Sequence, residues 1–384
     1  MIDPRRGDPW PAETTVGERA YLQALVEQGP AALCANAEGT VAEILRVGDR
    51  AIPVLLPDPV RSKAAFLVPT RHHLHYAVWS FARGSAVRRA LLWIGVSPLI
   101  AAFWATGLDR VVFVNHWLLT ASPRLELDAE GWAALFAFLA ARYPGRAIVL
   151  PDVLPAYRPE IEQALKAAGG KSVLSRTVYV MDTSTAGCDS AGSSARRQWR
   201  KARALMERCE RWRLDATAAW PSADHLRALY RKIYVDRYSP LNPDYRPAFF
   251  AVLRQVPETE HTAWVDDEGA TEAFAISWWS SNGVVWSAMG YEPISARERR
   301  LFPLISARIF LSAVDQRAFL QWGGGSGDFK RFRGAVSTPQ VDFIFDAHLP
   351  FRRRAGWQLL RHLRHLRARS AQHVDRNSAS AGNA

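Results

Sequence analysis

Residues 323–335 read GGGSGDFKRFRGA, a run in which five glycines surround a tight cluster of charged and aromatic side chains. It follows AFLQW (318–322), which has the composition of a short strand. Glycine lacks a Cβ atom, so backbone N–H groups can approach a bound group closely, and Lys330, Arg331 and Arg333 add cations at the same point. The pattern favours a site for an anion or a developing oxyanion. A surface turn with solvated charges is the alternative.

The second half of the chain alternates between segments with the hydrophobic periodicity of helices and segments with that of strands. We expect helices over 222–238 and 297–316, the second with a possible kink at Pro303, and a shorter helix in AFFAVLRQV (248–256). Three strand-like runs between 261 and 291 are separated by DDEG and SSNG turns, which is typical of an antiparallel meander. VDFIFD (341–346) is the last predicted strand.

The first half shows a similar alternation, although its pattern is less regular. Strands are predicted for 51–57, 64–69, 109–119, 146–153 and 172–182, and helices for 128–145 and 158–170. Residues 90–108 contain no charge; we interpret them as buried core broken at Pro98, with membrane contact as the alternative. The small polar residues of 184–194 predict a linker between the halves.

The charge of the chain is concentrated in two segments. Of the formal net charge of +12 over 384 residues, residues 193–213 carry +6 and residues 351–384 carry +7, which leaves the remainder at −1. This distribution indicates local anionic contacts and argues against a protein that coats DNA. Three scattered cysteines and an N-terminus without an early apolar run predict a reduced, cytoplasmic protein.

Common catalytic and metal-binding signatures are absent from the sequence. There is no GxxxxGK, GxSxG or HExxH motif, and Asp328 occupies the sixth position of the only GxGxxG-like run. His72, His73 and His75 form the one histidine cluster, and His73 and His75 would share a face of a strand. Because no carboxylate or cysteine lies near them in the sequence, we predict no metal site.

The order of elements in the second half, with VVWSAMGYEP (284–293) and GGGSGDFKRFRGA, resembles the acyl-CoA N-acyltransferase (GNAT) superfamily. The resemblance is to the double-domain branch of Fem-type aminoacyl transferases and CelD/BcsL-like acetyltransferases. It implies an α+β fold of two tandem GNAT-like domains, each a mixed, mostly antiparallel sheet flanked by helices, with a cleft where two middle strands part. The predicted organisation is a helical extension (1–39), a degenerate domain (40–183), a linker and basic helix (184–213), a catalytic domain (214–350) and a basic amphipathic helix with a disordered tail (351–384).

The resemblance also implies roles for individual residues. The candidate catalytic residues are Lys330, which would stabilise the oxyanion or contact a phosphate, Glu292, which would be a general base or a helix cap, and Tyr291 beside it. The implied substrate-binding residues are Tyr238, Ser239, Asn242, Phe329 and Arg331. The charged cluster adds Asp328 and Arg333 as candidates, and the end of the predicted strand 109–119 adds Asn115. The implied donor-binding glycines are Gly290, Gly325, Gly327 and Gly334. The pyrophosphate loop of the superfamily is missing, with EPISARERR (292–300) in its place.

The implied activity is transfer of an acyl group from a thioester, either acyl-CoA or an acyl carrier protein, to an amine of a small molecule or envelope precursor, with no permanently bound cofactor. A second hypothesis replaces the thioester with aminoacyl-tRNA held by the basic helix at 196–213. A third is a non-catalytic adaptor whose Trp- and Leu-containing basic tail helix lies on an anionic membrane. The predicted location is cytoplasmic, with contact at the inner membrane face in the third case.

Overall fold

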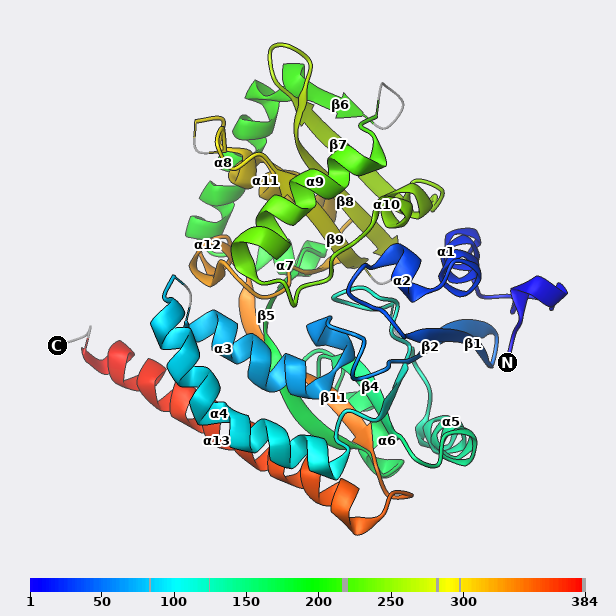
Figure 1. The fold of residues 1–384 in the computed structure, drawn as a ribbon. Coiled ribbons are helices and arrows are strands. Elements are labelled where there is room, and N and C mark those ends of the chain that lie inside the picture. The colour runs from blue at the N-terminus through cyan, green and yellow to red at the C-terminus, as the bar shows by residue number, and fades with distance from the viewer. Residues whose placement is uncertain (83, 124, 216–219, 281–282, 297, 382–384) are drawn as a thin grey trace.

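The computed structural model describes residues 1–384 except 83, 124, 216–219, 281–282, 297 and 382–384 (Figure 1). Within the described residues, eleven strands form one sheet in the order β1-β2-β3-β4-β11-β5-β10-β9-β8-β7-β6. Their bounds are β1 (Val41–Val47), β2 (Arg50–Leu56), β3 (Val111–Val114), β4 (Ala147–Val153), β5 (Lys171–Asp182), β6 (Arg213–Asp215), β7 (Thr259–Val265), β8 (Thr271–Ser280), β9 (Gly283–Tyr291), β10 (Phe319–Gln321) and β11 (Val336–Phe345). The pairings are antiparallel except for β3 with β4 and β10 with β9. The predicted α+β class with a mostly antiparallel sheet is confirmed.

The two halves of the chain exchange strands at the centre of this sheet. β11, from the second half, pairs with both β4 and β5 of the first half. β5 in turn pairs with β10 of the second half. The long strands β5 and β11 therefore join the sheets of the two halves into one.

The sheet opens at the parallel pair β9 and β10. These strands are paired at a single position, Leu320 with Val284, whereas β8 and β9 are paired along their length. A sheet whose neighbouring parallel strands meet at one point leaves room between them on one side. This arrangement agrees with the parting of middle strands that the resemblance implies.

Helices cover both faces of the sheet. Their bounds are α1 (Val16–Glu27), α2 (Pro30–Leu33), α3 (Tyr76–Phe81), α4 (Ala86–Thr106), α5 (Ala129–Arg142), α6 (Pro159–Ala167), α7 (Thr185–Asp189), α8 (Ser193–Arg208), α9 (Ala223–Ile233), α10 (Pro247–Leu253), α11 (Leu301–Asp315), α12 (Gly327–Arg331) and α13 (Phe351–Ala381). The α5 side chains Trp132, Phe136 and Leu139 pack on one face of β2–β4 and β11, because the strands present alternate apolar residues to each side. α1, α9 and α10 share a core on the opposite face. α8 and α11 pack together over the second half.

Several predicted helices form as the sequence indicates. α5 begins after Asp128, whose side chain accepts a hydrogen bond from the Gly131 amide (2.7 Å) and so caps the helix. Pro303 lies in the first turn of α11, where its missing N–H costs nothing, so the predicted kink does not occur.

The interpretation of residues 90–108 as buried core is wrong. Residues 90–106 belong to α4, a continuous 21-residue helix in which Phe103 is the buried residue. Pro98 does not break it. Among the described residues, this is the one helix long and apolar enough to span a membrane by length and composition. The prediction failed because an apolar run of this length is usually buried, whereas this one is held on the surface.

Two further strand predictions are wrong. Residues 64–69 form a short helical turn, η2 (Ala65–Leu67). The histidine segment forms a π-helical turn, η3 (Arg71–His75), that continues into α3. His72 and His73 therefore point toward the sheet from one turn of helix, and the predicted strand alternation does not apply.

Candidate functional site

A cavity of about 540 Å³ lies between the two halves of the chain. The first half contributes residues of η3, α3, β4 and β5, and the second contributes residues of α9, β9, α11 and the loop after β10. β11 and α13 complete the wall. The cavity therefore lies where the exchanged strands meet the opening between β9 and β10.

Two β-bulges shape the polar wall of this cavity, and both face β11. Opposite the step from Gln340 to Val341, β5 has one extra residue, Ser175. Opposite the segment from Val341 to Phe343, β4 also has one extra residue. A bulge bends its strand and redirects the local side chains, and bulges occur often beside active sites.

The bulge in β4 brings two carboxylates together. Asp152 has a φ of 66°, a left-handed conformation that is uncommon for residues other than glycine. Its amide donates a hydrogen bond to Oδ1 of Asp342 (3.3 Å), and both aspartates line the cavity. The side chain of Asp152 is 15% exposed. Strained backbone of this kind is concentrated at functional sites.

Burial holds protons on this pair of aspartates at higher pH than usual. It raises the pKa of Asp152 to about 7, an effect that Arg176 opposes and the charge of Asp342 reinforces. Burial also raises the pKa of Asp342 to about 6, against hydrogen bonds from the Asp152 amide and Ser175. Carboxylates that titrate near neutral pH can take up or release a proton under ordinary conditions.

Arg176 connects this pair to the rest of the cavity. Its Nη2 lies 3.8 Å from Oδ1 of Asp152, and its Nε donates to Oε1 of Gln340 (2.6 Å). Burial is the main cause of the lowered pKa of Lys330, and the positive charge of Arg176 is the second cause. Arg176 therefore lies close enough to both polar groups of the cavity to influence each.

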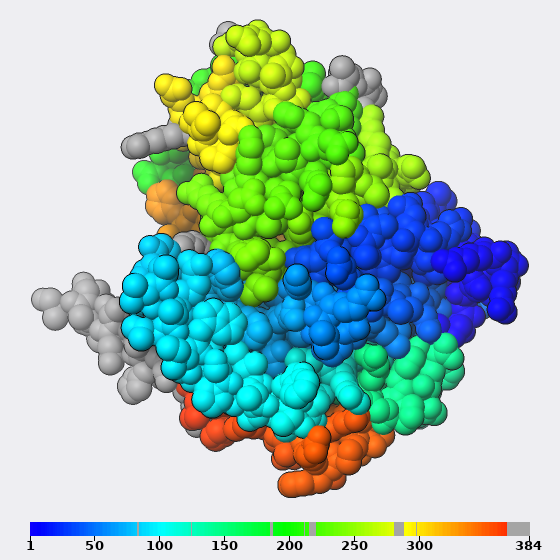
Figure 2. Space-filling model, in the orientation of Figure 1, coloured from blue at the N-terminus to red at the C-terminus, as the bar shows by residue number. Residues whose placement is uncertain are grey.

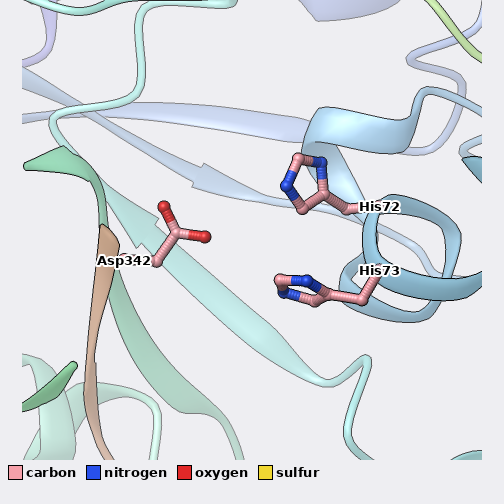
Figure 3. Close-up of side chains that lie close together, drawn as sticks. All are labelled: His72, His73 and Asp342. Carbon is pink, nitrogen blue, oxygen red and sulfur yellow. The ribbon is translucent and has the colours of Figure 1, made fainter. Parts of the chain in front are cut away.

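His72 and His73 lie beside Asp342 and approach it from η3 (Figure 3). One potential ligand atom from each of the three residues lies within 4.8 Å of the others, a donor set that could hold a metal ion. However, Nε2 of His72 is hydrogen-bonded to Oγ of Ser175 (2.9 Å), and burial followed by the charges of Arg176 and Arg364 lowers the pKa of His72 to about 3. Two guanidinium groups oppose a further cation at this point, so we assign no metal.

Lys330 is a buried residue in the wall of the same cavity. Its ammonium group donates to the carbonyl oxygens of Trp322 (2.6 Å), Gly323 (3.2 Å) and Gly324. Burial, and then the charge of Arg176, lower the pKa of Lys330 to about 7. An ammonium has three protons, and here three carbonyls accept from it. The Lys330 side chain therefore fixes the glycine loop that lines the cavity.

Four other residues of the predicted site also line the cavity. They are Tyr238, Asn242, Tyr291 and Gly325. The side-chain amide of Asn242 donates a hydrogen bond to the backbone carbonyl of Tyr234 (2.6 Å), which fixes the loop after α9. Burial raises the pKa of the Tyr291 phenol, so it stays a hydrogen-bond donor at neutral pH.

The structure places several predicted residues outside the cavity lining. Glu292 forms an ion pair with Lys232 of α9. Asn115 is buried, where it donates to the Pro123 carbonyl and accepts from the Trp117 indole, and buried Ser239 accepts from the Leu241 amide. Asp328 pairs with Arg331, and the Arg333 guanidinium lies 3.5 Å from the centre of the Phe329 ring. These contacts are structural ones.

The other predicted glycines allow close packing. A Cβ at Gly327 would lie 2.0 Å from the Tyr179 hydroxyl, and Gly334 has a φ of 97° and closes the turn after α12. At Gly290 a Cβ would lie 2.5 Å from Phe274 and 2.6 Å from the Tyr230 amide nitrogen. Gly290 therefore lets β9 pack closely against α9.

We expect Gly290→Ala to destabilise the protein by about 1–3 kcal/mol, because the added methyl group would overlap backbone atoms of α9. Gly95→Ala in α4 is the matched control, since a Cβ there meets nothing within 4 Å and alanine favours a helix. Denaturant unfolding measures both. Equal stability of Gly290→Ala and the unmodified protein would contradict the packing role.

The chain matches no family model and no curated protein sequence. Solved structures that it resembles include FemX, at 11% identity and a TM-score of 0.47 over 90% of this chain and 98% of that one. A putative lysylphosphatidylglycerol synthetase C-terminal domain from Agrobacterium fabrum has 12% identity and a TM-score of 0.41 over 62% and 78% of the two chains. L-PGS from Bacillus licheniformis has 13% identity and a TM-score of 0.37 over 56% and 72%. The function of this chain is therefore derived from its cavity.

Stability should depend on pH through the aspartate pair. The raised pKa of Asp342 means that its protonated form is favoured in the fold, so its contribution is lost as pH rises from about 4 to about 6. Asp342→Asn removes this loss, and the variant should gain on the unmodified protein by about 2–3 kcal/mol between pH 4 and pH 8. Denaturant unfolding at both pH values measures the gain. A constant difference between the two proteins would contradict the raised pKa.

Proposed function

We propose that the protein transfers an acyl or aminoacyl group from an activated ester or thioester to an amine bound in the interdomain cavity. The observation that carries this proposal is the aspartate pair on the bulged strands, which lines the same cavity as a glycine loop. The aspartate pair can bind and deprotonate an ammonium group, and the glycine loop can hold a carbonyl.

The acceptor amine enters as an ammonium ion, which Asp152 and Asp342 can bind through charge-assisted hydrogen bonds. An amine attacks a carbonyl only after it loses a proton. The raised pKa values of the two carboxyls suit them to take that proton near neutral pH, in contrast to an ordinary aspartate, which is too weak a base. The lone pair of the nitrogen then forms the new C–N bond.

The carbonyl side of the reaction is assigned to the glycine loop, 323–325, and to the tyrosines beside it. Backbone N–H groups of glycines can approach the oxygen that becomes negative in the tetrahedral intermediate. Tyr238 and Tyr291 line the same cavity and can donate hydrogen bonds. Collapse of the intermediate breaks the C–S or C–O bond, and the leaving thiolate or alkoxide takes up the proton that the carboxyl removed from the amine. Positioning supplies most of the rate, and the donor acts as a co-substrate.

The donor has two candidates, and a specific observation favours the second. A thioester such as acyl-CoA or an acyl carrier protein is the first, although the sequence has EPISARERR (292–300) in place of the pyrophosphate loop of the superfamily. The second is aminoacyl-tRNA. α8 presents an exposed basic face that fits phosphates of an RNA backbone, with Arg196, Arg197, Arg200, Lys201 and Arg208.

The experiment is a transfer assay with a panel of radiolabelled acyl-CoAs and aminoacyl-tRNAs and a mixture of small amines, with mass spectrometry of material that copurifies with the protein. Label transferred to an amine supports the proposal, and the active donor decides between thioester and tRNA. Binding of tRNA should weaken as salt is added. Absence of transfer from either donor, with a folded protein, would favour the non-catalytic adaptor.

A further inference from the structure

α4 presents an apolar surface that the described part of the fold does not cover. Val87, Leu91 and Ile94, at helical steps of four and three, are 72%, 65% and 71% exposed, and Trp104 near the other end is 70% exposed. Phe103 and Leu99 pack on the other side against α13, together with Trp357 and Leu360. α4 thus lies along α13 with its apolar outer face open, at the lower front of the view in Figure 2. Exposed apolar surface of this extent usually marks an interaction site.

The two sequence segments that contain α4 and most of α13 are basic and contain no acidic residue. Residues 59–108, which include α4, contain six Arg or Lys and no Asp or Glu. Residues 347–374, which include most of α13, contain seven Arg and likewise no acid. Arg88 at the start of α4 and Arg352 at the start of α13 are exposed. Two acid-free segments that are far apart in sequence are therefore adjacent in the fold.

We propose that α4 and the adjoining part of α13 lie on an anionic membrane surface, with the apolar side chains of α4 in the headgroup layer and the arginines against lipid phosphates. A helix that combines an apolar face with flanking cations has the composition of an interfacial helix. The packing of α4 against α13 along its inner side favours a helix in the plane of the membrane. This proposal does not depend on the proposed transfer reaction.

A second copy of the chain is the competing occupant of this face. In a twofold dimer the same surface would meet itself, so exposed cations such as Arg88 and Arg352 would face their own copies without acidic partners from these two segments. Like charges placed together oppose association, whereas an anionic bilayer complements them. The charge pattern therefore favours lipid.

The membrane face is continuous with the wall of the cavity. α3 contributes Tyr76, Ala77 and Ser80 to the cavity lining, and α13 contributes Trp357 and Arg364. α3 and α13 are the elements on either side of α4. A molecule held in the membrane beside α4 would therefore lie close to the residues of α3 and α13 that line the cavity.

The experiment is sedimentation of the full chain with vesicles of phosphatidylcholine alone and of phosphatidylcholine with phosphatidylglycerol. We expect binding to the anionic vesicles, weaker binding at high salt, and about tenfold or greater loss of binding in the double variant Leu91→Glu, Ile94→Glu. Ile294→Glu, at a side chain 91% exposed outside this face, is the matched control and should bind as the unmodified chain does. Arg88→Glu tests the charged part of the face and should weaken binding.

Three results would overturn the proposal. One is failure of the full chain to bind either kind of vesicle. Another is unchanged anionic binding in the Leu91→Glu, Ile94→Glu variant with circular dichroism like that of the unmodified chain. The last is a dimer in light scattering that this variant converts to a monomer, which would assign the face to a second copy.

Discussion

Asp342→Asn is expected to lower kcat/KM for amine acylation by about 10²–10⁴ while the protein remains folded. The amide has the shape of the carboxyl but cannot take a proton from the amine, and it carries no charge to hold an ammonium ion. Steady-state kinetics with the donor identified in the transfer assay measures the loss. The unmodified enzyme should also gain activity as pH rises through about 6 to 7, where the aspartate pair gives up its proton.

Asp315→Asn is the control for this variant, because Asp315 is an exposed partner of Arg203 outside the cavity. It should leave the rate and its pH dependence unchanged. If Asp342→Asn retained full activity with the same pH profile, the aspartate pair would not be the base, and the proposed reaction would lose its central observation.

Lys330→Met should lower turnover by about 10² and the free energy of unfolding by about 1–3 kcal/mol. Methionine fills a similar volume but leaves the carbonyls of Trp322, Gly323 and Gly324 without the ammonium that holds them. The loop would then shift, and small displacements in an active site cost large factors in rate. Kinetics and denaturant unfolding together measure both effects.

The two measurements separate the possible roles of Lys330. A positioning role predicts loss of both activity and stability, whereas direct contact with the oxyanion predicts loss of turnover with stability retained. Lys166→Met is the control, since Lys166 is exposed and pairs with Glu162 on α6. Unchanged activity and stability in Lys330→Met would exclude both roles.

The local elements of the fold were largely predictable from the sequence, because they depend on neighbours in the chain. α5 is bounded by Asp128 and by the Pro-Gly after Tyr143, and β5 and β11 show the expected β-branched and aromatic composition. The position of β11 between β4 and β5 was not predictable in this way. It depends on contacts between residues roughly 190 positions apart, such as Asp152 with Asp342.

The candidate site was predicted in part. The glycine loop, Lys330, Tyr238, Asn242 and Tyr291 were identified by motif, and they line the cavity. Asp152, Arg176 and Asp342 were missed, although a charged residue inside an otherwise apolar strand such as AIVLPDV is itself a signal. Their meeting depends on two bulges, and a sequence alone does not show the register of distant strands.

The exchange of β5 and β11 between the two halves has a consequence for folding during translation. When the first half of the chain has emerged from the ribosome, β4 and β5 have been synthesised. β11, the strand that lies between them, has not been synthesised, since it ends at Phe345. The nascent chain therefore exposes unpaired backbone N–H and C=O groups along β4 and β5 until β11 has been translated. Unpaired strand edges promote aggregation with other chains. We therefore expect the nascent polypeptide to need a chaperone until β11 inserts between β4 and β5.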